Sequence, residues 1–353
     1  MAHATLRDVA ARSGVSVRTV SNVVTGSKAV AEPTRARVQR AVEELGYRPN
    51  MVARSLRSGR SNIIAVAVPE LNVPYFAELV SEITARARER GYTVMIDQTG
   101  GAPDRERELL ASHSPAQMFD GLIVSALSLT AAEIRRRDHR LPLVLLGEHL
   151  SDGSFDHVGV DNVAAARAAT THLVDLGRRR IAPIGVLDPL TGTSQLRLLG
   201  YTQAHRLDGR EVDDRLLVPT GGFLRRHGAE AMARLLELPD PPDAVFCFND
   251  LLALGACRTL HDRGLKIPED VAVVGFDDVE DGRYATPSLT TIAPDKAAIA
   301  AQAVQLLVSR ITAVSVPVPQ DLWAGWTLEV RESTVRGGMV RGGTVREGTA
   351  PER

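Results

Sequence analysis

Short apolar runs alternate with helix-forming stretches over most of the chain, and this alternation constrains the fold more than any other feature. Many runs are nearly continuous in Val, Ile, Leu and Ala, as expected for parallel strands buried on both faces. The pattern predicts doubly wound α/β sheets covered by helices. The runs are 63–68, 92–96, 122–125, 143–146, 157–160, 181–186, 244–248 and 271–276.

Polar side chains follow several of these runs at the point where each predicted strand ends. In open parallel sheets the ligand crevice lies at the carboxyl ends of the strands, so these side chains are candidates for a ligand site. Helix capping is the alternative role for Asp161 and Asn249. The candidates are Asp97, Glu148, Asp161, Asn249 and Asp277.

The first 25 residues follow a different pattern, that of two short helices joined by a tight turn. Thr5 and Asp8 fit a capping box that begins the first helix. Gly14 fits its end, because glycine adopts a positive φ at no cost, and Ser16 fits the cap of the second helix. Two such helices form a helix-turn-helix, in which the second helix lies in the major groove of DNA.

The outward face of the second helix carries side chains that suit base reading. Arg18 has the donors for a bidentate contact to guanine, Asn22 suits adenine, and Val17 suits a thymine methyl group. On geometry alone, the alternative is a plain helical hairpin with a solvated polar face. The sequence therefore predicts a reading helix but needs a second observation to support it.

The distribution of charge supplies that observation. Residues 1–60 contain eleven Lys and Arg against four Asp and Glu, a net charge of +7, whereas the rest of the chain has a net charge of −8. A compact basic module favours a polyanion, because each neutralised phosphate releases counterions. A third helix is predicted from Pro33 to about Leu45, with Thr34 and Arg35 in its first turn, where they suit a phosphate.

The N-terminal segment resembles the DNA-binding domain of the LacI/GalR family of bacterial transcription regulators. Such a string of residues at these spacings is far more specific than a generic helix-turn-helix. The residues that carry the resemblance are Asp8-Val9-Ala10, Ala11, Gly14-Val15-Ser16, Thr19-Val20-Ser21, Val23-Val24, Val38, Leu45-Gly46-Tyr47, Pro49-Asn50 and Ala53-Arg54-Ser55-Leu56.

The resemblance implies a hinge helix after Pro49-Asn50, placed in the minor groove, with Leu56 as an apolar wedge between base pairs. The chain departs from the family at Asn22, where an arginine is usual, which suggests an altered operator preference. The candidate DNA-binding residues are Thr5, Ser16, Val17, Arg18, Thr19, Ser21, Asn22, Thr34, Arg35, Tyr47, Asn50, Ala53, Arg54 and Leu56.

The rest of the chain resembles the effector-binding core of the same family, which has the periplasmic-binding-protein type I fold. Matching segments include Val160-Asp161-Asn162, Phe248-Asn249-Asp250 and Val274-Gly275-Phe276-Asp277-Asp278. The resemblance implies two α/β subdomains with a ligand between them. The expected division is a helix-turn-helix domain at 1–48, a hinge at 49–60, subdomain one at 61–160 plus 293–322, subdomain two at 161–290 plus 323–332, and a tail at 333–353.

The cleft candidates suit a ligand with several neighbouring hydroxyl groups. Arg197, Asn249 and Asp277 offer a guanidinium, an amide and a charged acceptor. The aromatic candidates Tyr75, Phe76 and Tyr201 suit the apolar face of a ring, although Tyr201 also fits a core position. A monosaccharide, a glycoside or a nucleoside meets this description, and the family favours sugars.

Several classes of protein are disfavoured by the sequence. Two cysteines are too few for a disulfide framework, and there is no secretory signal and no apolar run long enough to span a membrane, so a cytoplasmic protein is expected. No metal spacing, nucleotide loop or nucleophile motif is present, so we expect neither a cofactor nor an enzyme. The Gly-rich repeat at 334–353 predicts disorder and lacks tetramerising heptads.

The sequence therefore predicts a sequence-specific DNA-binding regulator that is controlled by an effector. A repressor is the favoured type. We expect a homodimer on double-stranded DNA with a pseudo-palindromic operator, and a small sugar-like effector in the core. The alternative is a small-molecule binding protein without a gene-regulatory role.

Overall fold

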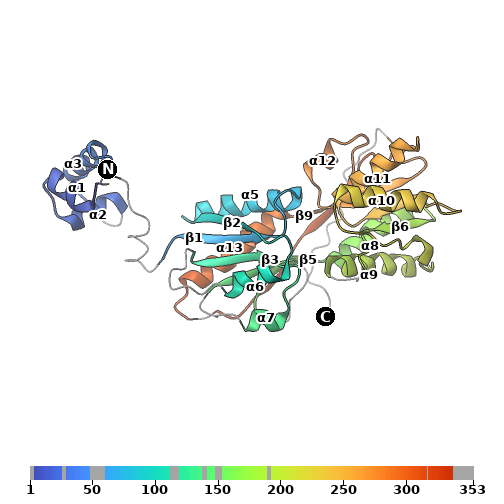
Figure 1. The fold of residues 1–353 in the computed structure, drawn as a ribbon, viewed down its shortest axis with the longest axis horizontal. Helices are drawn as coiled ribbons and strands as arrows, with labels where there is room; N and C mark the ends of the chain where they lie inside the picture. The colour runs from blue at the N-terminus through green and yellow to red at the C-terminus, as the bar shows by residue number, and fades with distance from the viewer. Residues whose placement is uncertain are drawn as a thin grey trace. The chain divides into compact units, whose positions relative to one another are not determined.

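The computed structural model describes residues 4–25, 29–47, 60–111, 119–136, 141–147, 153–188, 192–315 and 317–336. The chain separates into two compact units, Met1–Asn62 and Ile63–Arg353. Both are drawn in Figure 1. The helices of the first unit are α1 (Leu6–Ser13), α2 (Val17–Thr25) and α3 (Glu32–Glu44).

Local capping defines the helix-turn-helix as expected. Thr5 N–H donates to Asp8 Oδ2 at 2.8 Å and the Asp8 N–H donates to Thr5 Oγ1 at 3.4 Å, which completes the capping box of α1. Gly14 ends α1 with φ 66°, a left-handed conformation that glycine adopts without strain. The N–H of Thr19 donates to Ser16 Oγ at 3.1 Å, so Ser16 caps α2.

The three helices pack around a small core, in which Val9, Val20 and Val38 are fully buried. Val23 and Val24 are half-buried against this core. Burial of Val20, Val23 and Val24 fixes the rotation of α2 about its axis, and this places Val17 and Arg18 on the exposed side.

The second unit consists of two α/β subdomains. Subdomain one holds β1 (Ile63–Val68), α5 (Pro74–Glu89), β2 (Thr93–Gln98), α6 (Pro103–Ala111), β3 (Gly121–Ser125), α7 (Ala131–Arg135), β4 (Leu143–Leu146), β5 (Asp156–Val160), α13 (Lys296–Thr312) and β10 (Asp321–Ala324). Subdomain two holds α8 (Asn162–Asp175), β6 (Ile181–Ile184), α9 (Gly192–Leu207), a 3-10 turn (Asp214–Leu216), α10 (Arg225–Leu236), β7 (Ala244–Cys247), α11 (Asp250–Asp262), β8 (Ala272–Phe276), α12 (Glu280–Arg283), β9 (Thr290–Pro294) and β11 (Trp326–Glu329).

Each subdomain is built on one sheet, and the predicted doubly wound architecture is confirmed. The six-stranded sheet has the order β10-β5-β4-β3-β1-β2, with every pair parallel. The five-stranded sheet has the order β11-β9-β8-β7-β6, parallel except for β11, which runs antiparallel to β9. In Figure 1, α5 and α13 accompany the first sheet, while α8, α9, α10 and α11 accompany the second.

The chain passes three times between the subdomains, after β5, after β9 and after β10. Two of these passages lie later than expected, because β9 pairs in the second sheet as far as Pro294 and β10 pairs in the first as far as Ala324. Polar Thr290 and Thr291 interrupt the apolar signal of β9, although both are fully buried. Strand pairing therefore extends past the boundaries that the resemblance implied.

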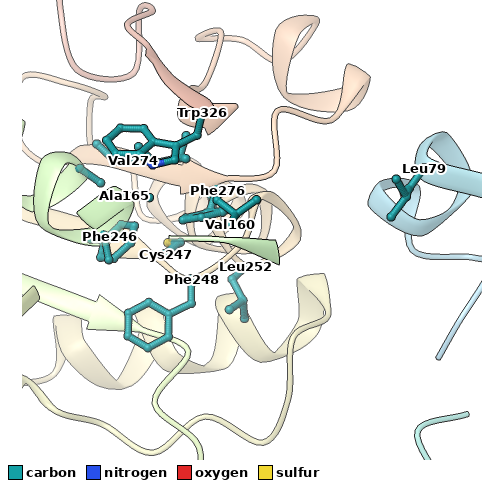
Figure 2. Packing of buried hydrophobic residues seen from close by; sticks show 14 of the residues in the cluster. Leu79, Val160, Ala165, Phe246, Cys247, Phe248, Leu252, Val274, Phe276 and Trp326 are labelled. Carbon is teal, nitrogen blue, oxygen red and sulfur yellow. The ribbon is translucent and has the colours of Figure 1, made fainter. Parts of the chain in front are cut away.

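The centre of subdomain two is rich in aromatic side chains from adjacent strands. Phe246 and Phe276, from β7 and β8, and neighbouring Phe248 are almost fully buried (Figure 2). Trp326 of β11 packs in the same cluster. Cys247 lies among them as a buried free thiol.

Helices α10 and α11 approach each other at a pair of glycines. A Cβ atom on Gly255 would lie 1.9 Å from the carbonyl oxygen of Arg225, and one on Gly228 would lie 2.1 Å from that of Leu252. Only glycine permits backbones to pack this closely. The contact fixes the position of α11 relative to α10. The first turn of α11 directly follows Asn249, one of the candidate ligand residues.

The folded part of the core ends later than the expected start of the tail at residue 333. Ser333 and Thr334 are buried, and Ser333 Oγ donates to the carbonyl of Val273 at 2.6 Å. The repeat from residue 337 onward, for which disorder was predicted, lies outside the described residues. Among the described residues, no helix is long and apolar enough to cross a membrane.

Candidate functional site

The exposed face of α2 presents the residues predicted to read bases. Val17 is 39% exposed, and Arg18 is also exposed. Asn22 and Ser21 are half-buried one turn farther on. An apolar side chain, a guanidinium and an amide thus lie on one short helix held by a fully buried valine. This set of groups suits the edges of base pairs in a major groove.

The start of α3 differs from the expected phosphate site. The N–H groups of Thr34 and Arg35 both donate to the carbonyl of Ala31, at 2.9 and 3.0 Å, so they do not serve as open donors. The guanidinium of Arg35 lies 3.8 Å from Glu32. Any phosphate contact here would therefore depend on side chains rather than on the backbone.

Three other predicted DNA contacts, Tyr47, Thr5 and the α2 cap Ser16, have structural roles in the first unit. Tyr47 packs in the three-helix core and is only 9% exposed. Thr5 uses its hydroxyl in the capping box. Thr19 is half-buried, and its Oγ1 lies 2.9 Å from Ser16 Oγ. The candidates Asn50, Ala53, Arg54 and Leu56 lie outside the described residues, as does the predicted hinge helix.

A cavity of about 480 Å³ lies between the two subdomains of the second unit. Subdomain one contributes Tyr75 and Phe76, whose rings meet edge to face with centroids 5.4 Å apart. Subdomain two contributes Arg197, Asn249 and Asp277. The structure thus brings together five of the nine residues that the sequence indicated for the effector.

Arg197 is held rigidly at this cavity although it is 94% buried from solvent, with only 6% of its surface exposed. Its Nε donates to Asn162 Oδ1 at 2.8 Å, and its Nη1 donates to the carbonyl of Phe248. Its Cζ lies 3.4 Å from the ring centroid of Phe276. Hydrogen bonds and the aromatic face together hold the cation in one orientation.

Asn249 combines the two roles that the sequence left open. Its Oδ1 accepts from the N–H of Leu252 at 2.9 Å and so caps α11, while its Nδ2 donates to the carbonyl of Phe223 at 3.0 Å. The residue also lines the cavity. Capping therefore places the side chain at the site and does not compete with that position.

Asp277 lies on a strained loop that follows β8. Its φ is 114° and that of Asp278 is 49°, both in the region that favours glycine. Such conformations cost about 1–3 kcal/mol each and persist only where neighbouring contacts enforce them. Asp278 forms ion pairs with Arg283 and Arg331, the latter at 2.6 Å. Burial alone would raise the pKa of Asp278, but these hydrogen bonds outweigh it and lower the pKa.

The buried carboxyl group of Asp250 contacts the loop that carries Asp277 and Asp278. Its Oδ2 accepts from the N–H of Val279 at 2.9 Å, and its Oδ1 lies 2.6 Å from Thr291 Oγ1. Burial raises the pKa of Asp250 well above its ordinary value, and the nearby charge of Asp277 raises it further. The loop is therefore fixed on one side by a carboxyl group that favours its neutral form.

Three of the predicted effector residues do not line the cavity. Tyr201 is fully buried in the core and donates its hydroxyl to the carbonyl of Ile181 at 2.7 Å, and burial raises its pKa. Asp161 caps α8 through the N–H of Ala164 at 2.9 Å. Asp97 Oδ1 lies 3.8 Å from Arg105 Nη2, with which it forms an ion pair. Glu148 lies outside the described residues.

Sequence reasoning also missed several residues that line the cavity. Ser125 ends β3, so the strand-end rule would have found it if hydroxyl groups had been included. Phe276 gave a strand signal only, yet its ring supports Arg197. Glu70, Ser194 and His227 lie in loops or early helical turns, where no sequence period marks them.

Comparison with known proteins gives a consistent result for both units. Residues 5–50 match the family described as bacterial regulatory proteins, lacI family, and residues 170–334 match the periplasmic binding protein-like domain. The ribose operon repressor of Escherichia coli strain K12 is 35% identical over 312 residues, which are 88% of this chain and 93% of that protein.

Two solved structures are similar over almost the whole chain. The transcriptional regulator CelR in complex with cellobiose is 34% identical, with a TM-score of 0.69, covering 94% of this chain and 99% of that one. The Lac repressor dimer bound to operator and the anti-inducer ONPF is 28% identical, with a TM-score of 0.79, covering 95% of this chain and 100% of that one.

Proposed function

This chain belongs to the lacI family of bacterial regulatory proteins and is a DNA-binding transcriptional regulator, and we propose that a sugar-like effector in its cavity controls its affinity for an operator. Its relatives are repressors, and repression is the action we assign to it. A DNA-bound regulator acts in the cytoplasm, where bacterial DNA lies. The family has a regulatory activity and not a catalytic one, so we assign no reaction to the cavity.

The observation that carries the effector assignment is the fixed position of Arg197 at the cavity. Subdomain one lines the same cavity with an aromatic wall, formed by Tyr75 and Phe76. A sugar offers hydroxyl groups that accept from the guanidinium and donate to Asp277, and its C–H face suits Tyr75 or Phe76. The volume of about 480 Å³ lies within the usual range for small-molecule sites. The complex of CelR with cellobiose supports a ligand of this class.

The DNA assignment adds residue-specific roles to the family result. We assign guanine reading to Arg18, adenine reading to Asn22 and a thymine methyl contact to Val17. A homodimer would place two copies of α2 on the two halves of a pseudo-palindromic operator. The Lac repressor dimer on its operator supports this arrangement.

The proposed coupling depends on the three passages between the subdomains. A ligand that binds one subdomain arrangement better than another shifts their equilibrium by its difference in affinity. That shift would change the spacing of the two hinge segments in a dimer and hence the order of the hinge helices on DNA. Whether the effector releases or promotes DNA binding depends on which arrangement it favours.

A mobility-shift assay with the DNA upstream of its own gene, at two salt concentrations, tests the proposal. A specific complex that persists against competitor DNA, and that changes when a sugar from a panel containing cellobiose and ribose is added, supports it. The alternative of a small-molecule binding protein predicts sugar binding in a thermal-shift assay without any specific DNA complex.

A further inference from the structure

Two side chains of subdomain one, Glu78 of α5 and Lys296 of α13, reach the strained loop that carries Asp277. Lys296 Nζ donates to the backbone carbonyls of Asp277 and Asp278, at 2.7 and 3.1 Å. Glu78 Oε1 accepts from the N–H of Glu280 at 3.4 Å. The loop belongs to subdomain two, so each of these hydrogen bonds crosses between the subdomains.

The two side chains also bind each other. Glu78 Oε2 lies 2.5 Å from Lys296 Nζ, and the lysine side chain is only 13% exposed. The Glu78 side chain is 36% exposed, so solvent screening is weak mainly at the lysine, and the ion pair orients both groups toward the loop. Lys296 donates to carbonyl groups of the loop, and Glu78 accepts from an N–H group of the loop. The pair therefore binds both acceptors and a donor of the loop backbone.

The same residues lie close to Tyr75, which lines the cavity. Tyr75 and Glu78 are three residues apart on α5, a spacing that places neighbouring side chains on one helical face. Lys296 Nζ is 5.8 Å from the ring centroid of Tyr75. The helical turn that presents the aromatic wall thus also carries the carboxylate that contacts the loop of Asp277.

We propose that Glu78 and Lys296 form a clamp that sets the position of Asp277 relative to Tyr75 and Phe76, and so determines the width of the effector cavity. They act as positioning residues, because their contacts are with the backbone of the loop and with each other. The strained φ angles of Asp277 and Asp278 are what such a clamp has to maintain. The inference rests on the proposed effector site for its role, while the clamp itself can be measured without DNA or sugar.

Hydrogen exchange with mass spectrometry on the full chain tests the clamp. Glu78→Gln keeps the shape of the side chain and removes the charge that Lys296 requires. We expect peptides covering 277–284 to exchange about 10-fold faster in this variant, because the loop loses a contact from the other subdomain. Lys296→Met should have a similar effect, and Lys296→Arg, which retains a cation with several donors, should restore much of the protection.

Two controls separate the clamp from general loosening. Glu89→Gln removes the same charge from the same helix at a site where the carboxylate pairs with Arg86, and it should leave exchange in 277–284 unchanged. The double variant Glu78→Gln/Lys296→Met should exchange no faster than the more affected single variant, since the two residues act as one unit. Protection of 277–284 that stays at the wild-type level in Glu78→Gln, or effects of the two substitutions that multiply, would overturn the proposal.

Discussion

The guanidinium of Arg197 stacks on the ring of Phe276, with its Cζ 3.4 Å from the ring centroid, while its Nε donates to Asn162 Oδ1. Arg197 belongs to α9, the ring comes from the end of β8 and the amide from the start of α8, so three elements of subdomain two meet at one cation beside the cavity. A fixed cation loses little conformational entropy when a ligand arrives, which favours binding.

Replacing Arg197 by Ala should weaken sugar binding and leave the protein able to bind DNA in the absence of sugar or in its presence. Hydrogen bonds to a charged group contribute about 1.5–3 kcal/mol, so we expect the sugar affinity to fall by about 10- to 100-fold. Isothermal titration calorimetry with the sugar identified by thermal shift measures this loss. Arg197→Lys is the matched control, because it keeps the charge but not the stacking, and unchanged affinity in the Ala variant would remove Arg197 from the site.

Replacing Asp250 by Asn should remove part of the pH dependence of stability. Thr291 Oγ1 lies 2.6 Å from Asp250 Oδ1 and 3.2 Å from the carbonyl of Ile292, and one hydroxyl proton cannot serve both acceptors. A proton on Asp250 satisfies the set, in agreement with its raised pKa. An Asn amide can donate to Thr291 and accept from the N–H of Val279 in the same way.

The sign of this effect follows from the raised pKa. The folded state retains the Asp250 proton where the unfolded state, with a pKa of about 3.9, has lost it. The wild-type free energy of unfolding should therefore fall as pH rises through the folded pKa, by up to about 1.4 kcal/mol per pH unit. Urea unfolding of both proteins across pH measures the difference between them. A difference that stays constant with pH would show that Asp250 is charged in the folded state.

Replacing Gly255 by Ala should destabilise the effector-binding core. The new Cβ atom would lie 1.9 Å from the carbonyl oxygen of Arg225, so α10 and α11 must move apart, at a cost of about 1–3 kcal/mol. Gly325→Ala is the control, because a Cβ atom there meets nothing within 4 Å. Thermal unfolding of both variants, followed by circular dichroism, measures the difference in their melting temperatures. Equal melting temperatures for Gly255→Ala and Gly325→Ala would contradict the close approach of the two helices.

Replacing Asn22 by Arg should change the preferred operator at one base pair in each half-site. An amide suits adenine and a guanidinium suits guanine, and a good bidentate contact discriminates by about 1–3 kcal/mol. Selection from a randomised DNA pool measures the preference of each protein. Arg37→Ala, which removes a cation from the exposed side of α3, is the control, and it should leave the preferred sequence unchanged. The same consensus for Asn22→Arg and the wild type would exclude Asn22 from base reading.

Local signals predicted the helix-turn-helix and most strands of the core. The capping box of Thr5 and Asp8, the stop at Gly14 and the cap at Ser16 depend on neighbours within a few residues, and all three are present. The strands β1 and β4 have the bounds that hydropathy indicated, because both are continuous apolar runs.

Features set by tertiary structure were harder to predict. Tyr47 was predicted to contact DNA, and Tyr201 was predicted to contact the effector or, as the alternative, to lie in the core. Each is buried by residues far away in the sequence, and local patterns do not reveal such partners. The strand-end rule correctly indicated Asn249 and Asp277, since carboxyl ends of parallel strands meet at one edge. It also selected Asp97, which lies elsewhere because β2 is at the edge of its sheet.

The most direct test of effector-controlled DNA binding is the fluorescence anisotropy of a labelled fragment from upstream of its own gene, titrated with the protein with and without the sugar found by thermal shift. We predict that saturating sugar changes the affinity of the wild type by at least about 5-fold, the lower end of ordinary allosteric coupling. The Arg197→Ala variant should show the same affinity with and without sugar. Identical wild-type curves in the presence and absence of a sugar that demonstrably binds would contradict the account.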